Sequence, residues 1–152
     1  LGRGWRIEIP KYLQFRATIN MLEFIGSIIG PWIDLLENNL EPFTCIISLT
    51  DSTTLAGWLK KSNFKESDNE SKEMTKAKLN IARGHALRLL ENDIKDYSQW
   101  IPGNENDIAD SLSRDFHMSN EKLTSLYFTS SPNQIPCNFK ISPLLLEIKY
   151  FI

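Results

Sequence analysis

Apolar and polar residues recur along the chain in patterns that predict where strands and helices lie. From residue 2 to 10, apolar and polar side chains alternate, which predicts a strand that ends at Pro10. From 18 to 40, apolar residues recur at helical spacing, which predicts a helix. Pro31 lies inside this pattern, so we expect a kink or a break near Gly30.

The middle of the chain continues this succession of element types. Residues 43–52 are apolar and rich in β-branched side chains, which predicts a buried strand in which Cys45 packs as a small hydrophobe. A short helix is predicted over 53–61, a long helix over 71–93 and a strand over 94–102.

Two of these elements offer several candidates for the buried core. In the long helix, apolar residues at helical spacing form the expected buried stripe: Met74, Leu79, Ala82, Ala86, Leu87 and Leu90. In the strand after it, the candidates are Ile94, Tyr97 or Ser98, and Trp100. We expect His85 and His117 to pack or to face solvent rather than to take part in chemistry.

The order of the elements indicates the fold class. After the strand over 94–102, a Pro-Gly turn precedes a short helix over 106–114. The order strand, helix, strand, helix, helix, strand, helix indicates an α/β fold with a mixed sheet flanked by helices. Beyond Phe116 the chain has several prolines and little periodicity. We therefore expect one domain over 1–116 and a Pro-containing linker over 117–152.

Charge is distributed unevenly along the chain. The net charge of the 152 residues is −2, but residues 60–88 hold eight Lys or Arg against four Asp or Glu. Local basic patches, rather than net charge, bind phosphate backbones, so this region is a candidate nucleic-acid surface. A solvated helix face rich in lysine is the alternative. The two cysteines lack metal-ligand spacing, no apolar run reaches membrane-spanning length, and no signal peptide is recognisable.

Three acidic residues have unusual positions in the predicted elements. Glu23 lies in the first turns of an otherwise apolar helix, and Asp110 lies on a short helix behind the Pro-Gly turn. Asp51 ends the predicted buried strand, and the carboxyl ends of strands are where α/β sheets place their sites. If all three converge at one edge of the sheet, their mutual repulsion requires a cation, and Mg²⁺ prefers such oxygen ligands. Two such ions about 3.5–4 Å apart would hold the attacking and leaving oxygens of a phosphodiester displacement.

Each acid also has a purely structural explanation. Asn20 and Glu23 fit a capping box, in which the glutamate satisfies backbone donors. Asp51 fits a helix N-cap, and Asp110 fits a favourable negative charge near a helix start. Taken one at a time, Glu23 and Asp51 are better explained by capping. The case for a metal site depends on the joint arrangement of the three.

Three segments resemble the ribonuclease H domain of retroelement reverse transcriptases. The closing motif of that family, a turn and an Asn before Ala-Asp-x-Leu-Ser-Arg, is similar to "IPGNENDIADSLSR". The helix that carries the catalytic Glu is similar to "TINMLEFIGSIIGPWI", and the strand end that carries a catalytic Asp is similar to "LTDSTTLAGWLKKSNF". The resemblance covers residues 2–116. The sequence of these motifs also resembles that of DIRS-type or other elements that integrate with a tyrosine recombinase.

The resemblance implies a metal-dependent nuclease. Glu23, Asp51 and Asp110 would bind two Mg²⁺ ions, or Mn²⁺, and metal-activated water would cut the RNA strand of an RNA–DNA hybrid during reverse transcription. The 2′-hydroxyl groups and the groove shape would distinguish the RNA strand from the DNA strand.

Further residues acquire expected roles from the same resemblance. Ser52, Asn106 and Arg114 would support the metal ligands, with Asn106 holding the turn or helix start beside Asp110. The Lys-rich stretch from residue 60 to 78 would contact phosphates. The lysines expected to do so are Lys60, Lys61, Lys65 and Lys76. The implied partners are a polymerase domain upstream and a recombinase or integrase module downstream. No membrane is implied, and the location would be the cytoplasm or the nucleus.

One departure from the family bears on activity. Family members carry a fourth carboxylate, an Asp on the first central strand, before the strand that "GRGWRIEIP" resembles. This chain begins at Leu1, after that point, and Glu8 lies on the wrong strand. The resemblance therefore implies an N-terminally truncated domain, inactive as this fragment. The alternative is a noncatalytic nucleic-acid-binding or scaffolding module of a retroelement polyprotein.

Overall fold

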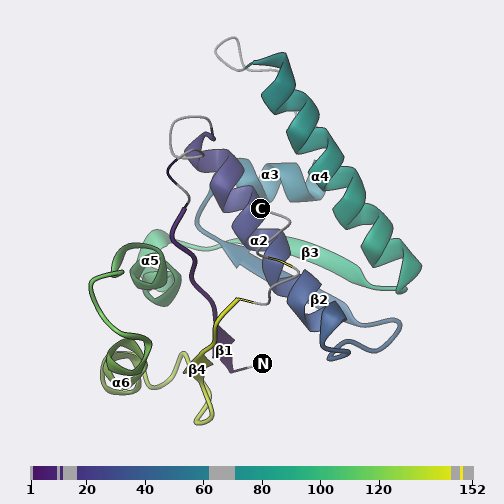
Figure 1. Cartoon of the computed structure of the whole chain (residues 1–152). Coiled ribbons are helices and arrows are strands. Elements are labelled where there is room, and N and C mark those ends of the chain that lie inside the picture. The colour runs from purple at the N-terminus through teal and green to yellow at the C-terminus, as the bar shows by residue number, and fades with distance from the viewer. Residues whose placement is uncertain (1, 10, 12–16, 62–70, 145–147, 149–152) are drawn as a thin grey trace. The chain divides into compact units, whose positions relative to one another are not determined.

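The computed structural model divides into two compact units (Figure 1). Unit 1 comprises residues 1–11 and 103–152, and unit 2 comprises residues 12–102. The residues described are 2–9, 11, 17–61, 71–144 and 148. Each unit has its own buried side chains and its own small sheet.

The described part of unit 2 holds three helices and two strands. They are α2 (Ile19–Leu36), β2 (Cys45–Thr50), α3 (Thr53–Lys61), α4 (Lys72–Glu91) and β3 (Lys95–Trp100). β2 and β3 are parallel, with Cys45 opposite Lys95 and Thr50 opposite Trp100. The order of these elements is the one that the sequence pattern predicted.

The described part of unit 1 is built from shorter elements. They are β1 (Arg3–Gly4), a 3₁₀ turn η1 (Gly103–Glu105), α5 (Asp107–Arg114), α6 (Asn120–Ser130) and β4 (Lys140–Ile141). β1 and β4 are parallel. The α/β class is confirmed, but the described strands form two separate parallel pairs instead of one mixed sheet. The cause is that β1 pairs with a strand from the C-terminal part of the chain.

The first predicted strand is much shorter than expected. Only Arg3 and Gly4 have a strand partner, and residues 5–9 form neither helix nor strand. The ladder is short because β4 is only two residues long. Beyond it, the Arg6 side chain donates hydrogen bonds to the α5–α6 connection, to the carbonyl oxygens of Asp115 and Met118, and to Oδ1 of Asn120 at 2.9 Å.

The segment expected to be a linker, 117–152, contributes to the hydrophobic core of unit 1. Its helix α6 and strand β4 join α5 in a cluster of buried side chains: Leu112, Leu123, Tyr127, Ile135, Phe139 and Ile141. A Cβ on Gly4 would lie 3.0 Å from the Phe139 ring, so β1 fits against this cluster because residue 4 is glycine. The two compact units divide near residues 11 and 102. The sequence pattern did not indicate the contribution of 117–152 to unit 1, because one short helix and a two-residue strand produce little periodicity.

Helix α2 runs through Pro31 without a break. Its N-cap is Thr18, whose Oγ1 accepts a hydrogen bond from the backbone N–H of Met21 at 3.3 Å. Pro31 costs the helix one backbone donor, but its side chain is buried together with those of Trp32 and Ile33. Burial of this apolar face stabilises the helix across the proline.

By length and composition, α2 is the one described helix apolar enough to cross a membrane, although we expected no such run. Core helices of soluble proteins meet the same criterion. The side chains that α2 buries are Met21, Phe24, Ile28, Ile29, Pro31, Trp32 and Ile33. The helix by itself therefore does not indicate a membrane protein.

The β2–β3 sheet is covered on one face only. Asp96 and Ser98 point to the covered face, where Ser98 donates to the carbonyl oxygen of Ala56 in α3. On the other face, Ile47 is 65% exposed and Tyr97 is 57% exposed. The prediction that β2 is buried on both faces, with Cys45 packed inside, was wrong, and so was the alternative that Tyr97 and Trp100 enter the core. Of the candidates in this segment, Ile94 is buried and Ser98 is half-buried.

The buried face of α4 also differs from the predicted stripe. The buried residues are Thr75, Lys78 and His85. Of the predicted stripe, Met74, Leu79 and Ala82 are half-buried, whereas Ala86, Leu87 and Leu90 are exposed. Lys78 and His85 are buried because each contacts an aromatic or polar partner in the interior. The Lys78 Nζ lies 4.6 Å from the centroid of the Trp58 ring, a cation–π contact.

Candidate functional site

Glu23 does not cap its helix. The N-cap is Thr18, and Asn20 lies inside α2, so the expected capping box is wrong. The Glu23 side chain is partly buried, and its Oε2 is fully shielded from solvent without a hydrogen-bond partner in the described part of the chain. A buried carboxylate oxygen without a donor costs free energy unless a donor or a cation approaches it.

Asp51 follows directly on β2 and does not cap α3. Ser52 does so, because its Oγ accepts from the backbone N–H of Leu55 at 3.2 Å. The capping explanation of Asp51 is therefore wrong, and Ser52 has a helix-capping role of its own. The backbone at Asp51 is well fixed: its carbonyl oxygen accepts from Trp100 Nε1 at 3.0 Å, while its side chain is exposed.

Asp110 has the structural explanation that the sequence allowed. It lies in the first turn of α5, where a negative charge is favourable. Its Oδ1 also pairs with Arg114 Nη2 at 2.8 Å, one helical turn further on. Asn106 is the N-cap residue of α5, as expected, but its side chain makes no capping hydrogen bond. Arg114 therefore contacts one of the predicted ligands.

The three acids do not all belong to one unit. Glu23 and Asp51 belong to unit 2, and Asp110 belongs to unit 1. Within the described residues, no group of three or more His, Cys, Asp or Glu side chains is close enough to hold a metal ion. The convergence of the three carboxylates on Mg²⁺ or Mn²⁺ thus stays a prediction.

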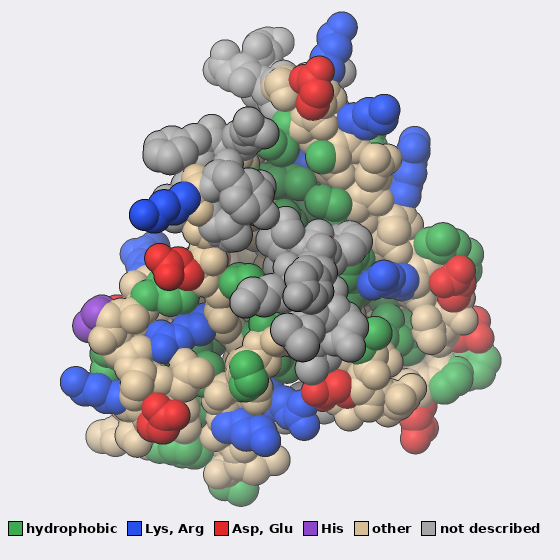
Figure 2. Space-filling model, viewed as in Figure 1, with side chains coloured by type: hydrophobic (Ala, Val, Ile, Leu, Met, Phe, Trp, Pro, Cys, Tyr) green, Lys and Arg blue, Asp and Glu red, His purple; other side chains and the backbone are tan. Residues whose placement is uncertain are grey.

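The predicted phosphate-binding lysines differ in exposure, and not all of them lie in the described part of the chain. Lys60 in α3 and Lys76 in α4 are exposed, as phosphate contact requires. Lys65 lies outside the described residues, as does the side chain of Lys61. Lys78, inside the same stretch, is only 2% exposed and cannot reach a ligand on the surface. Figure 2 shows that basic side chains also lie along the surface formed by α4.

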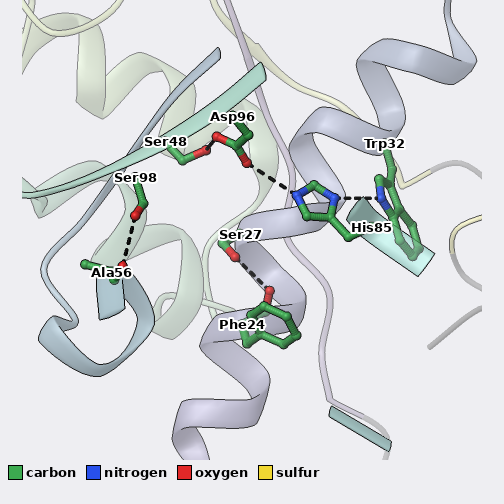
Figure 3. Close-up of polar contacts among 8 residues, drawn as sticks. All are labelled: Phe24, Ser27, Trp32, Ser48, Ala56, His85, Asp96 and Ser98. Atoms are coloured by element: carbon green, nitrogen blue, oxygen red, sulfur yellow. Dashed lines mark hydrogen bonds and ion pairs between the residues drawn. The ribbon is translucent and has the colours of Figure 1, made fainter. Parts of the chain in front are cut away.

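The most connected polar group of unit 2 was missed by the sequence analysis. Trp32 Nε1 donates to Nδ1 of His85 at 3.1 Å, so the proton of a neutral imidazole must lie on Nε2. That Nε2 lies 3.4 Å from Oδ2 of Asp96, and Ser48 donates to Oδ1 of Asp96 at 2.8 Å (Figure 3). His85 is buried, as one alternative for it allowed. The signal in the sequence was a histidine in the middle of the predicted long helix.

This network satisfies buried groups rather than forming a nucleophilic site. Ser48 donates to Asp96 and not to His85, so the imidazole is not placed to accept the proton of this hydroxyl group, as it would be in a serine–histidine nucleophilic site. Both oxygens of Asp96 are instead occupied by donors from β2 and α4. The group therefore ties α2, α4 and the sheet together.

Electrostatics in unit 1 centre on Arg6. Besides its hydrogen bonds, its guanidinium lies 5.5 Å from the centroid of the Phe116 ring. The pKa of Glu121, in the first turn of α6, is lowered. The causes are first the backbone N–H of Glu121 itself, then the hydroxyl group of Ser119, and to a smaller extent the charge of Arg6.

No protein-family model, curated protein or solved structure matches this chain. The likeness to retroelement ribonucleases H therefore rests on the sequence motifs quoted above.

Proposed function

We propose that this chain belongs to a metal-dependent ribonuclease H domain, which hydrolyses the RNA strand of RNA–DNA hybrids. The observation that carries the proposal is that neither Glu23 nor Asp51 has the capping role that would otherwise explain it. Glu23 has a buried oxygen to which no described residue donates, and Asp51 presents an exposed carboxylate at the carboxyl end of a parallel strand. Such strand ends are where α/β proteins place their ligands.

The proposal gives each acid a task. Glu23, Asp51 and Asp110 would be the ligands of Mg²⁺ or Mn²⁺, as the sequence motifs imply. Bound metal would supply charge stabilisation and an activated water. Ser52 would act indirectly, because its capping bond fixes the backbone next to Asp51.

The test is Mg²⁺-dependent cleavage of a labelled RNA strand in an RNA–DNA hybrid. It compares the chain with a version extended upstream by a strand that carries a fourth carboxylate. Asp51→Asn should lower cleavage by at least about a hundredfold, since even residues that only support metal ligands cost 10–100-fold. Asp93→Asn, at another exposed aspartate of unit 2, is the matched control and should cleave normally. Full activity in Asp51→Asn would exclude the assignment.

A second candidate is a noncatalytic nucleic-acid-binding module. It is favoured by the absence of a three-ligand cluster among the described residues. It predicts salt-sensitive binding of the hybrid without cleavage, even in the extended version. Binding without turnover in both versions would therefore select this candidate over the nuclease.

A further inference from the structure

Three basic side chains form a row along the outer face of α4: Lys72, Lys76 and Arg83. At 3.6 residues per turn, steps of four and seven residues return to nearly the same side of a helix. At 1.5 Å per residue, the row spans about 16 Å of helix axis. The α4 basic row, defined by these three residues, differs from the predicted lysine set because it adds Lys72 and Arg83 and leaves out α3.

All three side chains of the α4 basic row are available to a ligand. Each is exposed, in contrast to Lys78, which points inward from the same helix. Within the described parts of the chain, none of the three forms an ion pair. Glu73 lies three residues before Lys76 on α4, but among the described residues it forms no ion pair with the row. The row therefore presents three positive charges along one line without an ion pair in the described part of the chain, and Figure 2 shows basic side chains on the surface over α4.

We propose that the α4 basic row binds the phosphate backbone of a nucleic-acid duplex, independently of sequence. A duplex carries one negative charge per about 1.7 Å of its axis, so about 16 Å of helix faces several phosphates in any register. Long, flexible side chains on a straight helix can reach such phosphates without reading bases. The choice of nucleic acid among polyanions rests on the proposed function, whereas the binding itself needs neither metal nor hydrolysis.

The arrangement of the apolar residues favours a duplex over a lipid surface. A helix that lies on a membrane has its apolar side chains alongside its basic ones over its whole length. On α4 the exposed leucines, Leu87 and Leu90, come after the last cation of the row. Between Lys76 and Arg83 the exposed position is Asn80, which is polar. The basic part of the helix therefore has no apolar strip of its own to insert.

The test measures binding of a labelled RNA–DNA hybrid to the full chain in EDTA, between about 50 and 200 mM salt. The variant is Lys72→Gln, Lys76→Gln and Arg83→Gln together. The control is Lys95→Gln, Lys122→Gln and Lys140→Gln, three exposed lysines outside α4. Both triple variants remove three positive charges, so a difference between them reports position rather than net charge. Circular dichroism shows whether each keeps its helices.

In the α4 variant, the slope of log affinity against log salt should fall by about 1 per removed contact, or about 3 in total. The control should keep the slope of the unmodified chain. Equal slopes in the two variants would overturn the proposal. So would an α4 variant that binds the hybrid as the unmodified chain does but no longer binds phosphatidylserine vesicles. Because binding is measured in EDTA, it does not depend on catalysis. If the chain binds through α4 but the version extended upstream does not cleave in Mg²⁺, the proposed hydrolysis is refuted and the α4 basic row stands.

Discussion

The two long helices of unit 2 contribute to its stability in different ways. α2 buries seven side chains, all of them apolar, and its periodicity identified it at once. α4 is longer, yet its buried residues are Thr75, Lys78 and His85. α2 thus packs by the hydrophobic effect, whereas on α4 the buried Lys78 and His85 are held by aromatic or polar partners, and its other sides remain for solvent or ligands. The comparison teaches that an inward helix face need not be an apolar one.

The largest expected effect comes from Trp32, where the two helices meet. Its ring is 1% exposed on α2 and its Nε1 donates to His85 of α4. Trp32→Ala should lower the free energy of unfolding by about 3–5 kcal/mol, measured by denaturant titration. Leu36→Ala, on the same helix at 49% exposure, is the control and should cost far less. Equal losses would show that α2 is not the core helix described here.

An intermediate effect is expected at His85. His85→Leu keeps an apolar side chain at the site but leaves the Trp32 N–H without its acceptor and Asp96 with one donor fewer. The loss of stability should be about 1–3 kcal/mol by the same titration. His117→Leu, at the exposed histidine, should change little. Trp32→Phe is then made in the unmodified chain and in His85→Leu. If it lowers the free energy of unfolding equally in both, the two side chains are not coupled.

The smallest effect is expected on the outer side of α4. Leu90 is 73% exposed and would be a core residue if the predicted apolar stripe were correct. Leu90→Gln should therefore change the free energy of unfolding by no more than about 0.5 kcal/mol. A loss of 2 kcal/mol or more would restore the predicted stripe and remove the contrast between the helices.

The sequence predicted the order of the elements because periodicity is a local property. It did not predict which side of α4 is buried, because the inward position of His85 depends on Trp32, 53 residues away in the sequence. It did not predict α6 in the core of unit 1 either, because the apolar residues of α6 do not share one face: Leu123 and Tyr127 are buried, whereas Leu126 and Phe128 are exposed.

The candidate site was predicted with the same mixture of success and failure. Glu23 and Asp51 lie on the elements to which the motifs assigned them. Their capping explanations failed by one or two residues, because Thr18 and Ser52 supply better-placed hydroxyl groups. Convergence with Asp110 depends on how segments of two units assemble, which periodicity does not encode.

The short connection between β2 and α3 has a consequence for protein engineering. Around Asp51, the N–H of Ser52 bonds to Thr50 Oγ1, the N–H of Ile101 bonds to the Thr50 carbonyl oxygen, and the Trp100 indole bonds to the Asp51 carbonyl oxygen. The backbone at position 51 is thus held from both strands while its side chain is exposed. New side chains can be introduced at position 51 with little loss of stability. Because the backbone there is already ordered, a ligand that binds such a side chain would lose little further backbone entropy.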